Sequence, residues 1–231
     1  MSSLTVQDIF HHFMPSYIQK YKLSGAQAKV VRCITQCKTG YLGMNTSFCE
    51  DCGSIHVHYN SCRNRCCPMC QELPTQKWID ARKEDVLDAP YFHVVFTLPE
   101  ELNPIMYSNQ KHLYTVLYHA ASETLNTLSI DSKHLGAKIG YICVLHTWGS
   151  TMNYHPHLHC IVLGGGLNDR NQWVDNGEKF FLPIKVLSRM FRGKYMEKLR
   201  RLWEDGMLAF HGSASVYKKS LFFQRTSQHL L

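Results

Sequence analysis

The chain has 231 residues, of which 45% are hydrophobic, and carries a formal net charge of +7 with its 14 histidines neutral. This length allows one large domain or two small ones, and no window approaches the roughly 18 unbroken apolar residues of a membrane span. The N-terminus lacks the apolar region of a secretory signal, so we expect a cytoplasmic protein, without a membrane partner, whose ten cysteines are thiols or metal ligands.

The first forty residues are predicted to form two helices. In segment 8–21 the apolar residues recur at helical spacing, and Pro15 indicates a break or kink. Ser24 is a capping signal for a second helix over residues 26–35, with Ile34 buried. Neither helix carries a chemical motif, so both are interpreted as packing elements.

Eight of the ten cysteines lie between residues 33 and 70. Cys49-Glu-Asp-Cys52 and Cys67-Pro-Met-Cys70 are Cys-x-x-Cys knuckles separated by fourteen residues, close to the spacing of a zinc ribbon. Each knuckle supplies two thiolates, which are half of the tetrahedral set that Zn²⁺ prefers. We therefore predict a structural Zn²⁺ bound by Cys49, Cys52, Cys67 and Cys70.

The remaining cysteines of this segment suggest a second zinc site. Its candidate ligands are Cys37, Cys62 and Cys66, together with His56 and His58. Their spacing fits no single zinc template. For the two knuckles, the alternative is a set of buried or redox-active thiols, against which their paired spacing argues.

Beside the second knuckle, Arg63 and Arg65 are candidate phosphate contacts, with a solvated surface as the alternative. The amphipathic segment 75–88 is predicted to be a helix that joins the cysteine-rich module to the C-terminal part of the chain, and Pro90 ends it.

The segments after Pro90 predict an α+β domain. Residues 92–98 and 140–148 are rich in β-branched and aromatic residues and are predicted strands, while residues 103–128 show helical spacing. A third strand precedes Gly164-Gly165-Gly166, which we expect to stop it. This order predicts an antiparallel sheet with helices packed on one face.

Three histidines mark the third strand. His155, His157 and His159 alternate with other residues, so they would share one face. Side chains two residues apart lie about 6.5 Å from each other along a strand, so His157 and His159 can converge on one divalent ion, whereas His155 lies too far from His159. The alternative is the polar face of a half-exposed strand.

Residues 167–179 are predicted to be a loop, and Pro183 then opens a helix over residues 184–208. This helix is the most basic stretch of the chain. We interpret it as a surface for the nucleic-acid backbone, with a solvated face as the alternative. The candidate DNA contacts on it are Arg192, Lys194, Arg200 and Arg201.

Several segments together resemble one family, the rolling-circle insertion-sequence transposases with an N-terminal zinc-binding domain and an HUH (His-hydrophobic-His) nuclease domain. Residues 59–71 resemble its zinc signature and residues 93–99 its first nuclease strand. Residues 146–149, 155–162 and 164–167 resemble its metal motif and flanks. The resemblance covers nearly all of residues 25–212.

The resemblance implies a zinc-binding domain over residues 1–88 and an HUH nuclease domain over residues 89–231. It implies a partner that is single-stranded or hairpin DNA, with no small-molecule substrate. His157 and His159 would bind a Mg²⁺ or Mn²⁺ that polarises the scissile phosphate, while a tyrosine attacks it. On ligand softness alone, an imidazole pair favours zinc or manganese, so the identity of this metal stays open.

The chain departs from the family pattern at two points. Cys66 stands where the family usually has a histidine, and no segment matches the downstream helix that carries the nucleophilic tyrosines. A truncation or frameshift near Gln224, followed by an unrelated tail over residues 225–231, would explain the second departure. No nucleophile is therefore identified: Tyr195 is interpreted as a packing residue, Tyr217 as a loop residue, and Tyr154 as the likeliest substitute.

These departures leave two functions in competition. The first is a DNA-nicking transposase that is catalytically incomplete here. The second is a zinc-dependent nucleic-acid-binding module without catalysis. A zinc deaminase is excluded because the chain lacks His-x-Glu before Pro-Cys-x-x-Cys.

Overall fold

A computed structural model describes residues 4–180 and 182–218, which form two compact units divided between Leu87 and Asp88. Residue Gln224 and the predicted tail 225–231 lie outside the described residues. Within the described segments, no helix combines the length and apolarity that crossing a membrane requires.

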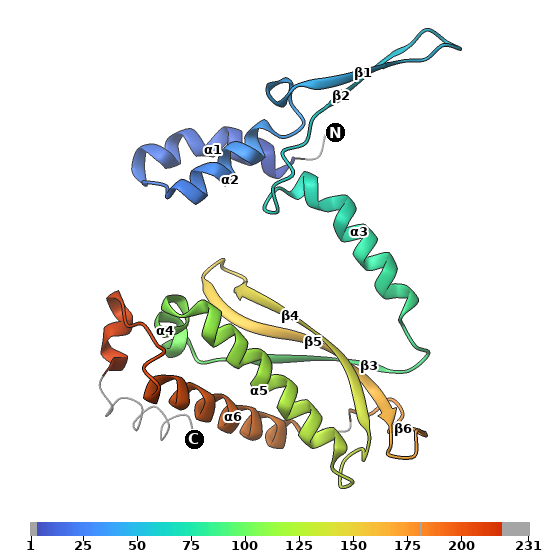
Figure 1. The fold of residues 1–231 in the computed structure, drawn as a ribbon, viewed down its shortest axis with the longest axis vertical. Coiled ribbons are helices and arrows are strands. Elements are labelled where there is room, and N and C mark those ends of the chain that lie inside the picture. Colours follow the sequence, from blue (N-terminus) through green and yellow to red (C-terminus); the bar gives the residue numbers. More distant parts are fainter. Residues whose placement is uncertain (1–3, 181, 219–231) are drawn as a thin grey trace. The chain divides into compact units, whose positions relative to one another are not determined.

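In residues 4–87, the described part of the first unit, there are three α-helices, a short 3₁₀ helix (Gly40–Leu42) and a β-hairpin (Figure 1). The α-helices and strands are α1 (Val6–Lys20), α2 (Gly25–Gln36), β1 (Met44–Phe48), β2 (Ile55–Tyr59) and α3 (Pro68–Glu84). Thr5 and Ser24 cap α1 and α2 through capping boxes, because each side chain accepts from the N3 amide while the N3 side chain contacts the cap amide. The two expected helices are therefore present, with Pro15 inside α1.

Two features of this unit differ from the sequence prediction. The hairpin β1–β2 was not predicted, because its strands lie among the cysteines and were interpreted only as metal-ligand spacing. Helix α3 runs from Pro68 to Glu84, whereas the predicted segment was 75–88. The helix therefore begins seven residues earlier and ends four residues earlier than predicted. Proline suits the first helical turn because that turn leaves its amides unbonded.

The second unit confirms the predicted α+β class, with helices packed on one face of an antiparallel sheet (Figure 1). The strands are β3 (Tyr91–Thr97), β4 (Lys138–Trp148), β5 (Tyr154–Leu167) and β6 (Trp173–Asp175), and the helices are α4 (Asn103–Ser108), α5 (Gln110–Ile130) and α6 (Ile184–Glu204). The sheet order is β3-β5-β4, with β6 paired to β5. Its core joins Phe96, Leu158 and Val162 of the sheet to residues of α5 and α6.

A buried asparagine divides the single helix predicted over residues 103–128. Asn109 is 6% exposed and has non-helical backbone angles between α4 and α5. Its side-chain amide donates to the carbonyls of Ile105 and Ala209, at 2.9 and 2.8 Å, and its carbonyl accepts from the Ala209 amide at 2.7 Å. At this break between the two helices, the Asn109 side chain hydrogen-bonds the backbone of Ala209, in the segment after α6.

The glycine run does not stop β5, as the sequence predicted, but continues it to Leu167 and pairs it with β6, so residues 167–179 are not wholly loop. A Cβ added to Gly166 would lie 2.1 Å from the carbonyl oxygen of Lys138 on β4. A Cβ on Gly165 would lie 2.4 Å from the Trp173 ring of β6. The glycines are needed because neighbouring strands approach so closely.

Candidate metal centres

The side chains of β5 alternate between the core and an open face of the sheet. Leu158 and Cys160 are fully buried against the helices, so His157 and His159 project from the other face. The antiparallel register of β4 places His146 directly opposite His157. Three imidazoles from two paired strands are thereby brought to one place.

The ligand atoms of His146, His157 and His159 all lie within 4.8 Å of one another. The two Nε2 atoms of His157 and His159 are 2.9 Å apart. His157 Nδ1 lies 2.6 Å from the His155 carbonyl oxygen, which can only accept, so Nδ1 carries the proton and Nε2 offers its lone pair to the centre. This group of three histidines, called here the histidine site, was predicted from the sequence only as the pair His157 and His159.

A fourth histidine supports this group from β3. His93 Nε2 lies 2.7 Å from His159 Nδ1, and the two rings are nearly parallel at 14°, with centroids 4.9 Å apart. His159 therefore has one ring nitrogen on His93 and the other facing His157. Metal-bound histidines are commonly held in this way through the nitrogen that does not bind the ion.

Charge and orientation complete the histidine site. Burial, followed by the neighbouring His146, His157 and His93, lowers the pKa of His159, which favours the neutral, ligating imidazole near neutral pH. The His155 ring instead hydrogen-bonds Thr97 Oγ1 at 3.1 Å and is not in the group. Three imidazoles suit a first-row divalent ion, and three protein ligands leave further coordination positions open.

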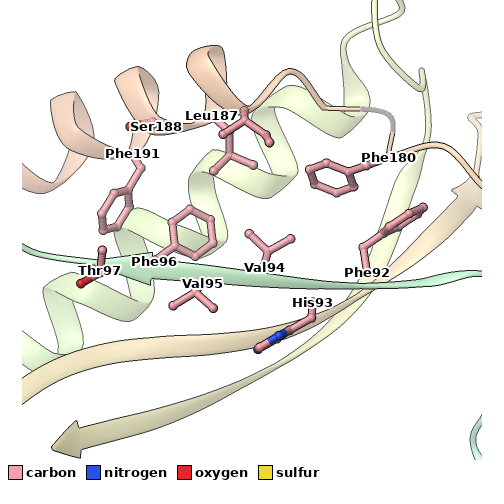
Figure 2. A pocket seen from close by; sticks show the side chains of 11 residues that line it. Phe92, His93, Val94, Val95, Phe96, Thr97, Phe180, Leu187, Ser188 and Phe191 are labelled. Carbon is pink, nitrogen blue, oxygen red and sulfur yellow. The ribbon is translucent and has the colours of Figure 1, made fainter. Parts of the chain in front are cut away.

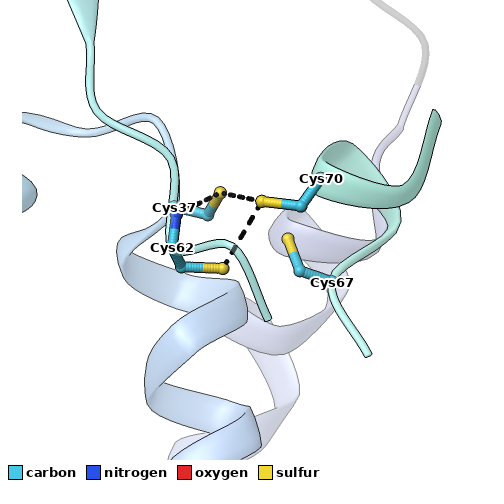
Figure 3. A group of neighbouring side chains, drawn as sticks. All are labelled: Cys37, Cys62, Cys67 and Cys70. Atoms are coloured by element: carbon cyan, nitrogen blue, oxygen red, sulfur yellow. Dashed lines mark hydrogen bonds between the residues drawn. The ribbon is translucent and has the colours of Figure 1, made fainter. Parts of the chain in front are cut away.

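A second group consists of four cysteines in the first unit (Figure 3). Cys37 ends α2, Cys62 follows β2, and Cys67 and Cys70 lie at the start of α3. Cys70 Sγ lies 3.4 Å from Cys37 Sγ and 3.6 Å from Cys62 Sγ. Zn–S bonds of about 2.3 Å in a tetrahedron separate sulfurs by about 3.8 Å, so this group, the four-thiol site, fits zinc.

Backbone amides support the sulfurs of the four-thiol site. The Cys62 amide donates to Cys37 Sγ at 3.4 Å, and the Asn64 amide donates to Cys62 Sγ at 3.5 Å. Burial raises the pKa of the Cys37 and Cys62 thiols. Burial therefore favours the protonated thiols of Cys37 and Cys62. A metal ion that binds them as thiolates has to displace these thiol protons.

The structure groups the cysteines differently from the sequence prediction. Cys67 and Cys70 do come together, but their companions are Cys37 and Cys62, whereas Cys49 and Cys52 lie in the turn between β1 and β2. Cys66, predicted for a second site, is exposed and outside the four-thiol site. The sequence pattern did not predict this grouping, because a Cys-x-x-Cys turn supplies two of four tetrahedral ligands without specifying the other two.

The basic residues predicted to bind DNA occupy different environments. Arg63 and Arg65 are exposed in the loop before α3. On α6, Lys194 and Lys198 reach Glu123 of α5 at 3.6 and 2.7 Å. These two lysines therefore contribute to helix packing.

The remaining candidates on α6 are also distinguished by their contacts. Arg201 pairs with Glu197 at 2.5 Å, Arg200 is exposed, and Arg192 is partly exposed. Since α6 covers the face of the sheet opposite the histidine site, these cations do not line that site.

The three tyrosines considered as nucleophiles face away from the histidine site. Tyr154 points to the helix side, where its hydroxyl lies 2.9 Å from that of Tyr114, and burial raises its pKa. Tyr195 of α6 is 1% exposed, so it is a packing residue. Tyr217 is not a loop residue but lies in a 3₁₀ helix, and its hydroxyl donates to the Glu101 carbonyl.

An apolar cavity of about 450 Å³ lies between β3 and α6 (Figure 2). Phe92, Phe96 and Phe191 are among its lining residues. The imidazole of His93 is directed to the other side of β3 from Phe96, toward the histidine site. The cavity and the histidine site are therefore on opposite faces of the strand.

Among solved structures, the chain is similar to two complexes of the conjugative relaxase TrwC with oriT DNA. One is described as metal-bound, with 12% identity, coverage of 48% of this chain and 43% of that chain, and a TM-score of 0.38. The copper-bound complex has 13% identity, coverage of 53% and 46%, and a TM-score of 0.40.

Sequence relatives are more similar. Over 95% of this chain and 56% of the relative, it is 43% identical to a putative transposase y4qJ of Sinorhizobium fredii. Over 65% of this chain and 36% of the relative, it is 33% identical to the transposase for insertion sequence element IS801 of Pseudomonas savastanoi pv. phaseolicola. The chain thus spans just over half of the first relative and about a third of the second.

Two family profiles also match. The family described as a transposase zinc-binding domain matches residues 9–98, which contain the four-thiol site. The family described as a putative transposase matches residues 140–229, which contain the histidine site. The chain belongs to the rolling-circle insertion-sequence transposases that carry an N-terminal zinc-binding domain.

Proposed function

We propose that the histidine site binds Mg²⁺ or Mn²⁺ and positions a single strand or hairpin of DNA for nicking and joining during transposition, in the cytoplasm. The observation that carries the proposal is the convergence of His146, His157 and His159 on the open face of the sheet. A divalent ion bound there would polarise a phosphate oxygen and offset the charge that develops during strand transfer.

The side chains of the chain have distinct roles in this proposal. His157 and His159 present their Nε2 atoms to the ion, His146 supplies the third imidazole, and His93 orients His159. Among the described residues of the second unit, the helices pack on the opposite face of the sheet, so they do not cover the three rings. We further propose that Cys37, Cys62, Cys67 and Cys70 bind the structural zinc.

Strand transfer also needs a nucleophile in line with the phosphate, and such geometry tolerates errors of only about 1 Å. Tyr154, Tyr195 and Tyr217 do not face the histidine site. We therefore propose that the described part of the chain binds metal and DNA, and that none of these three tyrosines becomes covalently attached to DNA.

The experiment compares Mn²⁺ binding by calorimetry in the full chain and in variants. The His157→Ala variant loses a proposed ligand of the ion. Its Mn²⁺ affinity should therefore fall at least about tenfold, because removal of a residue that only hydrogen-bonds a ligand already costs that much. His155→Ala is the matched control, because that ring contacts Thr97 instead. Equal affinities in the two variants would refute the assignment.

A DNA assay separates this function from the alternative, a zinc-dependent nucleic-acid-binding module without catalysis. Mn²⁺ should strengthen binding of fluorescent single-stranded DNA by the unmodified chain and by His155→Ala, but not by His157→Ala. The alternative predicts no Mn²⁺ effect in any of them. In a denaturing gel with end-labelled DNA, labelled protein would contradict the lack of covalent attachment.

A further inference from the structure

Two cysteines outside both metal-centre groups face each other across the sheet of the second unit. Cys143 on β4 lies directly opposite Cys160 on β5 in the antiparallel register. Their sulfur atoms are 2.9 Å apart, and both are free thiols. Among the described residues, no third side chain joins them in a metal-binding group. These two residues, called here the cross-strand thiol pair, therefore belong neither to the four-thiol site nor to the histidine site.

The backbone at the cross-strand thiol pair is suited to a disulfide. Directly opposed residues of antiparallel strands have Cα atoms about 4.5 or about 5.5 Å apart. Disulfides span Cα separations of about 4.4 to 6.8 Å, which include both values. The two sulfurs would have to approach by less than about 1 Å to reach the S–S bond length of about 2.05 Å. Movement of the side chains alone can therefore close the bond.

The two thiols differ in their access to solvent. Cys143 is partly exposed and lies on β4, which ends the sheet order β3-β5-β4, whereas Cys160 is fully buried. A small oxidant can therefore reach Cys143, while Cys160 is shielded from it. The second unit contains no other cysteine, so within this unit Cys160 is the thiol that can react with an oxidised Cys143.

We propose that the cross-strand thiol pair is a redox-active modification site, which a peroxide closes to a disulfide between β4 and β5. With hydrogen peroxide, Cys143 Sγ attacks one oxygen, the O–O bond breaks, and a sulfenic acid and water form. Cys160 Sγ then attacks Cys143 Sγ, the S–S bond forms, and the S–O bond breaks. The departing oxygen takes the Cys160 proton and leaves as a second water, so two thiols and one peroxide give one disulfide and two waters.

The disulfide would join the two strands that carry the histidine site, which run side by side (Figure 1). The register between β4 and β5 is regular from Tyr141 to His146 and irregular at both ends of this stretch, which contains Cys143. Closure would therefore fix the register that places His146 opposite His157. In a reducing compartment disulfides are transient and often redox-sensing, so the thiol form is the resting state. The pair can close whether or not the histidine site holds an ion.

The experiment treats the folded full chain with hydrogen peroxide in the presence of Zn²⁺, unfolds it with a thiol-blocking reagent, and digests it with trypsin. Trypsin cleaves after lysine and arginine, so residues 139–170 form one peptide, whose two cysteines are Cys143 and Cys160. This peptide should carry no blocking group and should be about 2 Da lighter than its dithiol form, because a disulfide has lost two hydrogens. Reduction with dithiothreitol should restore two thiols that can be blocked.

Two variants and an unfolded sample serve as controls. Cys143→Ser should leave one thiol in the peptide, which is blocked, whereas Cys66→Ser removes an exposed cysteine of the first unit and should leave the disulfide unchanged. The chain unfolded in urea should give less of this disulfide, because the strands no longer pair. Two blocked thiols in the peroxide-treated folded chain, oxygen added to Cys143 without a disulfide, or an equal disulfide yield in urea would overturn the proposal.

Discussion

His93 shows how a single side chain outside the three histidines of the histidine site can orient that site. Its Nε2 lies 2.7 Å from Nδ1 of His159, so it can accept a hydrogen bond from the Nδ1 proton of His159 and leave the Nε2 lone pair of His159 free for an ion. Carboxylates and backbone carbonyls are usual in this role, and here an imidazole takes it.

We predict that His93→Ala lowers Mn²⁺ affinity about 10- to 100-fold, the usual cost of losing an outer partner. His93→Gln should recover part of that loss because its side-chain carbonyl can accept the same hydrogen bond, whereas His93→Phe should not. Calorimetry with the three variants measures both effects. Equal affinities for Gln and Phe would mean that only packing matters at this position.

Sequence reasoning predicted the pair His157 and His159 because two alternating imidazoles on one strand are visible in the chain itself. It did not predict that His146 lies beside them, because that neighbour depends on the register between β4 and β5. The signal was available in part: segment 140–148 was predicted to be a strand of the same antiparallel sheet, and counting residues back from the turn before the histidine strand would have brought His146 near His157.

Among the elements, α6 shows that an abundance of lysine and arginine does not by itself define a binding surface. Leu187, Phe191, Tyr195 and Leu199 recur every four residues and form its buried stripe. Lys194 and Lys198 flank this stripe and meet Glu123, whose pKa is lowered first by the hydrogen bond from Lys198. Their charges are partly balanced within the fold.

We therefore predict that Lys194 contributes less to DNA binding than Arg200, which is exposed on the same helix. If Arg200 contacts a phosphate, Arg200→Ala should weaken binding similarly for all sequences and reduce the salt slope by about one. Lys194→Ala should change that slope less. Fluorescence anisotropy over a range of salt concentrations gives the slopes, and a larger change for Lys194→Ala would contradict this ranking.

Strand β5 shows why local signals placed elements but not all of their bounds. The strand predicted before Gly164-Gly165-Gly166 is present, but three glycines ordinarily indicate the end of a strand. Here glycine is required because of residues in other strands. Lys138 lies against the backbone of Gly166 and Trp173 against that of Gly165, so any side chain at these two positions would collide with them. Tertiary contacts of this kind are invisible in the local pattern.

At the scale of the whole molecule, the two units have unequal cores. The second unit buries a large set of side chains from its sheet and helices. The first has a small buried cluster of Ile34, Cys37 and Cys67, and α1 and α3 bury no residue. Two of these three buried residues belong to the four-thiol site, so we expect the stability of this unit to depend on a zinc ion bound there.

We predict that removing zinc with a chelator unfolds the first unit and leaves the second folded. Hydrogen exchange on the full chain should show lost protection in α2 and the start of α3, while α5 and β5 stay protected. Because zinc must displace thiol protons, the unit should release the ion more readily as pH falls. Protection in the first unit that survives complete zinc removal would contradict this dependence.

The alternation along β5 has a consequence for how this protein can change over generations. From His157 to Cys160, odd-numbered residues face the open side of the sheet and even-numbered residues face the core. A single inserted or deleted residue would turn each following side chain to the other face of the sheet. The imidazoles would then point into the core, and Leu158 and Cys160 would point to the open face. Point substitutions can therefore be tried one at a time in this strand, whereas a one-codon length change would bury its histidines and expose its core residues in the same event.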